Sequence, residues 1–156
     1  MLDLFSDQVV SVDTARDQGF LQGMGIIEAL DPSANGNEPA TGSYSGGEYE
    51  VVCHEPTDGA VDGGRTAMET CLAQNPDINV VYTINEPAAQ GAYDALTAAG
   101  SAEGVIIVSV DGGCDPGLRL VSEGVIDNGP AVPGPHGDAR HADHQDARRL
   151  RRSPIG

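Results

Sequence analysis

Two stretches decide the fold: Val80-Val-Tyr-Thr-Ile-Asn-Glu-Pro87 and Val105-Ile-Ile-Val-Ser-Val-Asp-Gly-Gly113. Each is an apolar run that ends on a polar side chain, Asn85 in the first and Asp111 in the second. Strands with so little polar alternation are typical of a parallel sheet covered by helices on both faces. Ligands of such sheets bind just beyond the carboxyl ends of the strands. Asn85 and Asp111 are therefore the leading candidates for ligand contacts.

Strand patterns alternate with helix patterns along the rest of the chain, which predicts βαβ units. We expect strands at 2–4, 49–53, 78–84 and 105–110, with a fifth beginning at Val125. Helices are expected at 13–30, from about 62 to Asn75-Pro76, at 87–99 and at 118–122, and 33–48 is typical of a surface loop. The predicted fold class is α/β, a Rossmann-like parallel sheet with helices on both faces.

Helix boundaries and buried faces can also be predicted. Asp13 or Thr14 is expected to cap the first helix, which would bury Phe20, Met24, Ile27 and Leu30. The helix at 87–99 presents a stripe of small and apolar residues, and Gly100 is expected to end it in the left-handed conformation. The stripe consists of Ala88, Ala92, Ala95, Leu96 and Ala99.

Composition limits the class of protein. The 156 residues suffice for one domain, and the net charge of −16 without any lysine argues against nucleic acid as a partner. No stretch approaches the roughly 20 apolar residues of a membrane span. The start, Met1-Leu-Asp-Leu-Phe-Ser-Asp7, lacks the features of a signal peptide, so the chain as written is expected to stay cytoplasmic.

The chain divides at residue 127 by composition. Residues 1–127 form the predicted α/β domain, whereas 128–156 are rich in Arg, His and Pro and are expected to be disordered. His136, His141 and His144 lie in that tail, so we predict no metal site there and no cofactor. Three cysteines leave two alternatives, one disulfide with a free thiol or three reduced thiols; the reduced state is favoured, with Cys53 in the core.

Several phrases resemble the type I periplasmic substrate-binding proteins of sugar ABC transporters, most closely the fructose-type branch. They are Arg16-Asp-Gln-Gly-Phe-Leu-Gln-Gly-Met-Gly-Ile26, Gly63 through Ala89, and Ile107-Val-Ser-Val-Asp-Gly-Gly-Cys114. The resemblance implies a second lobe of a two-lobed protein that binds a monosaccharide between its lobes for delivery to a permease. The intact parent would be periplasmic or in the cell envelope, and would not be an enzyme.

The resemblance also implies roles for individual residues. Asn85 and Asp111 match an asparagine and an aspartate that hydrogen-bond sugar hydroxyls, and Arg16 matches an arginine at the start of the lobe's first helix. A carboxylate, an amide and a guanidinium together offer the acceptors and donors that a sugar requires. This chain by itself is expected to bind sugar weakly or not at all, because one lobe leaves most hydroxyls facing water.

After residue 127 the family's pattern is missing. Pro130-Ala-Val-Pro133 stands where the family has Gln-Gln-Tyr-Pro, and codons CCA GCA GTA CCN, shifted by one base, encode that family sequence. We therefore interpret 128–156 as out-of-frame translation, which the underlying DNA would decide.

Simpler roles compete for each candidate. Asn85 would cap the following helix, Asp111 would stabilise a turn before two glycines, Arg16 would pair with Asp13 or Asp17, and Glu86 would face solvent.

Two functions compete with transport. One is the effector-sensing domain of a transcription regulator of the same fold. The other is an α/β enzyme, for which no nucleophile and base are found.

Overall fold

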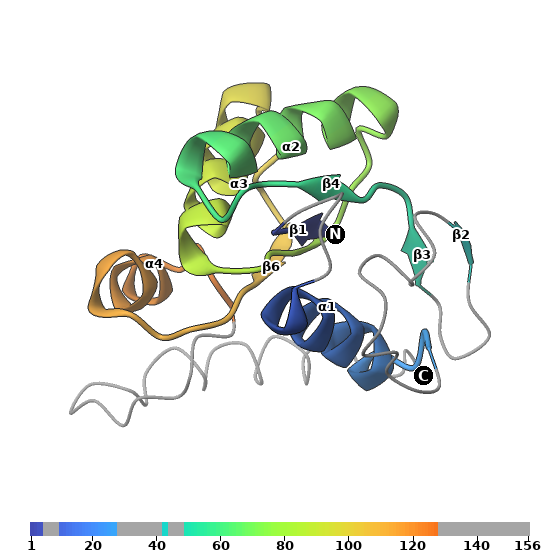
Figure 1. The fold of residues 1–156 in the computed structure, drawn as a ribbon. Helices are drawn as coiled ribbons and strands as arrows, with labels where there is room; N and C mark the ends of the chain where they lie inside the picture. Colours follow the sequence, from blue (N-terminus) through green and yellow to red (C-terminus); the bar gives the residue numbers. More distant parts are fainter. Residues whose placement is uncertain (5–9, 28–41, 44–48, 128–156) are drawn as a thin grey trace, which may run out of the picture.

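The computed structural model describes residues 1–4, 10–27, 42–43 and 49–127. The predicted tail, 128–156, most of the loop expected at 33–48 and the burial expected for Leu30 lie outside these residues, so these expectations stay predictions. The first helix ends at Gly23 and not at residue 30 as expected. Strands are short, and helices lie on both sides of them (Figure 1). The α/β class predicted from the sequence is confirmed.

Four parallel strands run side by side through the middle of the molecule. β1 (Leu2–Asp3) pairs with β4 (Glu55–Pro56), and β5 (Val80–Tyr82) pairs with β6 (Ile106–Val108). A parallel bridge between Leu2 and Thr83 joins the two pairs, so the strand order is β4-β1-β5-β6. The carboxyl ends of all four strands therefore meet at one edge.

The strand expected at 49–53 is in part wrong. β3 (Glu50–Val51) pairs antiparallel with β2 (Gly42–Ser43), and β4, a few residues later, takes the place beside β1. The fifth strand is also wrong, because Val125 and Ile126 are buried without strand pairing. The chain does run beside β6 here, since the Asp127 amide donates to the Ile107 carbonyl at 2.9 Å.

Helices α2 (Val61–Gln74) and α3 (Glu86–Ala99) cover one face of the strands, and α1 (Ser11–Gly23) covers the other (Figure 1). A turn, η1 (Cys114–Leu118), in which Asp115 has an extended backbone, leads into the short α4 (Arg119–Ser122). Gly100 ends α3 at φ 71°, as predicted. Ala88, Ala92, Ala95 and Leu96 are buried as expected, whereas Ala99 is exposed.

Close contact between α2 and α3 depends on two glycines. A Cβ on Gly64 would come within 2.3 Å of the Ala88 carbonyl oxygen, and one on Gly91 within 1.9 Å of the Val61 carbonyl oxygen. Because real side-chain atoms do not approach backbone so closely, only glycine permits this spacing. The small residues of α3 thus serve helix–helix packing as well as packing on the sheet.

Helix α1 differs most from its sequence-based description. Its N-cap is Val10, and Asp13 and Thr14 lie inside the helix. The buried face consists of Asp13, Thr14, Asp17, Gln18 and Leu21, not of the expected apolar stripe, since Phe20, Met24 and Ile27 are only partly buried. Burial of Asp13 is explained in part by the Leu4 amide, which donates to Asp13 Oδ1 at 2.9 Å. A buried carboxylate needs such a donor.

The favoured reduced state of the cysteines is wrong for two of them. Cys53, just before β4, forms a buried disulfide with Cys71 of α2, and Cys114 is free and exposed. Cys53 does belong to the core, as expected. Within the described residues, no helix has the length and apolar character needed to cross a membrane.

Candidate functional site

The carboxyl edge of the sheet brings two of the three predicted ligand residues into contact. Arg16 projects from α1, and its Nη2 contacts Oδ1 of Asp111, which follows β6. The same guanidinium donates through Nη1 to the carbonyl oxygen of Ile84 at 3.0 Å. Ile84 directly precedes Asn85, so the guanidinium connects the ends of β5 and β6. The expected pairing of Arg16 with Asp13 or Asp17 on an exposed helix face is replaced by this bridge, and both of those acids are buried.

Asp111 has an unusual backbone. Its φ is 110°, a value that side chains with a Cβ rarely adopt, and Gly112 follows at φ 90°. Holding a non-glycine residue there costs on the order of 1–3 kcal/mol, so the surroundings must fix it. The simple turn interpretation of Asp111 does not account for this conformation. Such residues are concentrated at binding sites, where geometry matters more than local stability.

Asn85 carries out the structural role that competed with ligand binding. Its Oδ1 accepts a hydrogen bond from the Ala88 amide at 3.0 Å and so caps α3, while Nδ2 donates to the Gly59 carbonyl at 2.9 Å. A side-chain amide has two donor hydrogens and two acceptor lone pairs. One donor and one acceptor therefore remain, and the residue is only partly buried. The cap orients the amide without exhausting it.

Glu86 was expected to face solvent, and this is wrong. The residue is 5% exposed, and its carboxylate accepts the Gly112 amide at 2.6 Å and the Gly113 amide at 3.1 Å. An acid in the first turn of a helix can be accounted for by the helix dipole without any buried partner. The sequence held no signal for this contact, since the partners are backbone amides, which every residue except proline carries.

A second polar group lies beneath the sheet, on the α1 side. Asp3, Asp17 and His54 bring one potential ligand atom each to within 4.8 Å of one another, and His54 Nε2 contacts Oδ2 of Asp3. Nearby, burial raises the pKa of Tyr82, and the charges of Asp17 and Asp3 raise it further. We assign no metal to this group, because His54 Nε2 and Asp3 Oδ2 already contact each other.

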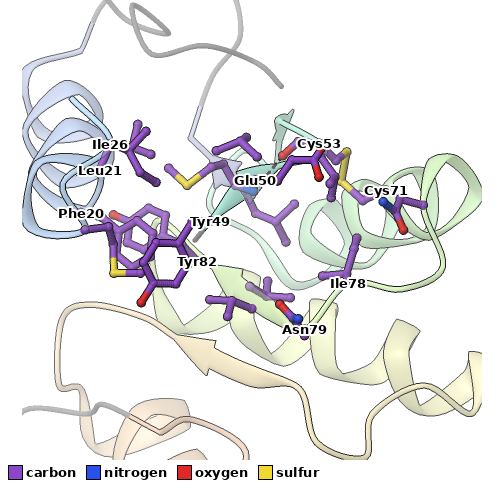
Figure 2. A pocket seen from close by; sticks show the side chains of 18 of the residues that line it. Phe20, Leu21, Ile26, Tyr49, Glu50, Cys53, Cys71, Ile78, Asn79 and Tyr82 are labelled. Atoms are coloured by element: carbon purple, nitrogen blue, oxygen red, sulfur yellow. Dashed lines mark hydrogen bonds between the residues drawn. A yellow bond between two sulfur atoms is a disulfide. The ribbon is translucent and has the colours of Figure 1, made fainter. Parts of the chain in front are cut away.

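A cavity of about 400 Å³ lies away from the predicted ligand residues. Figure 2 shows Phe20, Tyr49 and Tyr82 on one side of it, and the disulfide on the other. Asn79 and Val80, which also line it, stand at the beginning of β5. The cavity is thus at the amino edge of the sheet, and Arg16, Asn85 and Asp111 do not line it. It is not the expected sugar site.

A family model described as "Periplasmic binding proteins and sugar binding domain of LacI family" matches residues 52–150. The chain belongs to this family. Its members are sugar-binding proteins and not enzymes. At the level of the family, this confirms the predicted resemblance to periplasmic binding proteins and the prediction that the protein is not an enzyme.

Curated relatives include two ribose import binding proteins called RbsB. The protein from Salmonella typhimurium is 31% identical over 106 residues, which cover 68% of this chain and 34% of the relative. The Escherichia coli protein is 30% identical over 106 residues, which again cover 68% of this chain and 34% of the relative. The chain thus aligns with about a third of the length of these relatives.

Two solved structures are also similar. A solute binding protein of an ABC transporter from Bacillus halodurans, with bound myo-inositol, has a TM-score of 0.48 at 30% identity and covers 54% of this chain and 28% of its own. A protein from Mycobacterium smegmatis has a TM-score of 0.59 at 24% identity and covers 80% of this chain and 36% of its own. The latter supports the fold alone.

Proposed function

We propose that the chain is one lobe of the substrate-binding component of a sugar ABC transporter. The intact protein would capture a monosaccharide between two lobes and deliver it to a membrane permease. The observation that carries this proposal is the bridge made by Arg16, which contacts Asp111 and the carbonyl next to Asn85 at the carboxyl edge of the sheet. Ligands of open α/β sheets bind at that edge.

The chemistry of the three side chains fits a sugar. Asp111 offers acceptors only, Arg16 offers donors only, and Asn85 retains one of each. A sugar hydroxyl both donates and accepts, so it can bridge the carboxylate and the guanidinium in place of their direct contact. Hydrogen bonds to charged groups contribute about 1.5–3 kcal/mol each. This set can therefore select among sugars by the positions of their hydroxyls.

The disulfide between Cys53 and Cys71 supports transport over cytoplasmic sensing. Disulfides persist in oxidising compartments such as the periplasm and are rare in the cytosol. A transcription regulator of the same fold works in the reducing compartment, where this bridge would not be maintained. We therefore propose a periplasmic location for the intact protein.

For the sugar itself we propose a fructose-like monosaccharide, on the residues that resemble the fructose-type branch. Ribose is the competitor, because curated relatives are ribose import proteins. One lobe supplies only part of the partners a sugar needs, so the chain by itself should bind in the millimolar range or more weakly, which corresponds to about 4 kcal/mol.

The test is a titration of the ¹⁵N-labelled chain with D-fructose, D-ribose and D-glucose, followed by NMR. Binding should shift the amide signals of Gly112 and Gly113 and the side-chain signals of Asn85 and Arg16. Asp111→Ala should abolish these shifts, whereas Glu69→Gln, an exposed acid on α2, should retain them. Shifts confined to the cavity residues around Tyr49 would reject the site, and micromolar affinity would reject the one-lobe interpretation.

A further inference from the structure

Glu86 connects α3 to the loop that carries Asp111. Its carboxylate oxygens each accept one backbone amide, Oε1 from Gly112 and Oε2 from Gly113. Hydrogen bonds with an ionised acceptor are stronger than those between neutral groups. Because α3 is a long helix packed on α2, the carboxylate is a fixed point against which the loop is held.

The loop needs such a fixed point. Asp111 and Gly112 both have positive φ, so the two residues bend the chain away from the direction of β6. An unanchored chain would relax to ordinary values, and the Asp111 carboxylate would then turn away from Arg16. The two amides that Glu86 binds belong to the residues directly after Asp111. The anchor thus acts at the place where the strain is stored.

Two glycines leave room for the carboxylate on the loop side. A Cβ on Gly117 would come within 2.0 Å of Glu86 Oε1, and one on Gly113 within 3.1 Å of Oε2. Gly117 is itself buried, and its φ is not positive. Its lack of a side chain is therefore explained by the space that Glu86 occupies, not by backbone conformation.

We propose that Glu86 is a positioning residue for sugar binding: it fixes Asp111 in the orientation that presents its carboxylate to Arg16 and to a sugar hydroxyl. This inference rests on the proposed function for the sugar. The competing explanation is that Glu86 only stabilises the helix dipole of α3. Asp62, an exposed acid in the first turn of α2, provides the matched control for that effect.

The experiment compares Glu86→Gln with Asp62→Asn in the full 156-residue chain. A glutamine offers one acceptor oxygen and turns an NH2 group toward the second amide. We expect amide exchange at Gly112 and Gly113 to rise at least about tenfold in Glu86→Gln, with a changed H–N–Cα–H coupling of Asp111 and altered side-chain signals of Arg16. Asp62→Asn should leave all three unchanged. The affinity for D-fructose and D-ribose should fall by about tenfold in Glu86→Gln only.

Gly117→Ala disturbs the same contact from the loop side. It is the substitute variant if Glu86→Gln does not fold. Its methyl group would displace the carboxylate, and the same three signals should change. The proposal is overturned if Gly112, Gly113 and Asp111 respond in Glu86→Gln as in Asp62→Asn. If neither sugar binds the wild-type chain while the loop signals change as expected, the sugar-positioning role of Glu86 in this lobe fails and the anchoring of Asp111 by Glu86 stands.

Discussion

Arg16 and Asp111 contact each other across the carboxyl edge of the sheet, although 95 positions separate them in the sequence. Their side chains are 28% and 40% exposed, so water screens the ion pair. Exposed pairs of this kind contribute about 0–1 kcal/mol to stability. The strained backbone of Asp111 costs at least as much, which makes the pair a poor stabilising device. Its cost is understandable if the two groups are held ready for a ligand.

Replacing Asp111 should therefore separate stability from binding. In Asp111→Ala the Cβ and its strain remain while the ion pair is lost. In Asp111→Gly the strain at φ 110° is relieved as well. We expect the glycine variant to be more stable than the alanine variant by about 1 kcal/mol, although glycine usually destabilises. Urea unfolding measures this difference.

Both variants should lose sugar binding alike, because neither has a carboxylate. The control is the same pair of substitutions, to alanine and to glycine, at Asp94. This residue of α3 forms an ion pair with Arg65 and has an ordinary backbone conformation. There glycine should be the less stable substitution, since Asp94 lies inside a helix. An alanine variant at 111 that is as stable as the glycine variant would show that the backbone is not strained.

Asn85 should contribute to both stability and binding. Asn85→Ala removes the cap of α3 and the bond to Gly59, and we expect a loss of about 1–2 kcal/mol. Asn85→Asp retains the cap acceptor but cannot donate to the Gly59 carbonyl, so it should be intermediate in stability. Thermal and urea unfolding of the three proteins measure the order. Equal stability of Asn85→Ala and wild type would contradict the contacts of the amide.

The sequence predicts the residues at the strand ends, Asn85 and Asp111, but not Glu86, which holds the loop in place. Runs of apolar residues that end on Asn85 and Asp111 reveal strand ends, because the pattern is local and its periodicity is simple. Glu86 is invisible to the same reasoning, since its partners are backbone amides 26 and 27 positions away. Backbone donors carry no residue identity. Only the tertiary structure shows that a helix-start acid is turned inward.

The predictions for the buried face of helix α1 and for the cysteines were wrong for a related reason. Hydrophobic periodicity assumes that buried faces are apolar, yet α1 buries Asp13 and Asp17. For Asp13, the Leu4 amide from another segment supplies a hydrogen bond that periodicity cannot reveal. The pairing of Cys53 with Cys71 depends on how α2 lies on the sheet, and cysteine spacing does not encode this. Strands are also shorter than their apolar runs, because pairing begins only where a neighbour is in reach.

Reducing the disulfide should destabilise the domain. Cys53 and Cys71 are 18 positions apart, and a bridge that closes a loop of this size contributes about 3 kcal/mol. In a Cys114→Ser background, which prevents exchange with the exposed free thiol, a reductant should lower the urea midpoint by a corresponding amount. A thiol titration that finds two reactive groups in the unfolded, unreduced variant would contradict the bridge.

The hydroxyl of Tyr82 should lower stability. Tyr82 is buried and its ring stacks on Phe20 with centroids 4.5 Å apart, yet among the described residues its hydroxyl has no hydrogen-bond partner. A buried polar group without a partner costs about 1–3 kcal/mol. We expect Tyr82→Phe to retain the stacking and to unfold at higher urea concentration than wild type. Tyr49→Phe, at an exposed tyrosine, is the control and should change little.

Alkaline pH should widen the difference between Tyr82→Phe and wild type. Burial, followed by the charges of Asp17 and Asp3, raises the pKa of Tyr82 in the folded state, so the neutral phenol is favoured there. In the unfolded state the group ionises near its usual pKa of about 10. Below that pH the phenol is neutral in both states, so the free energy of unfolding of wild type is unaffected by this group's ionisation. Above it, the free energy of unfolding of wild type falls by up to about 1.4 kcal/mol per pH unit, because only the unfolded state ionises. The phenylalanine variant has no such loss. Urea unfolding at neutral pH and near pH 11, with Cys114 alkylated in all proteins, measures the effect. A constant difference between the two proteins across this range would show that Tyr82 ionises as readily in the folded state as in the unfolded one.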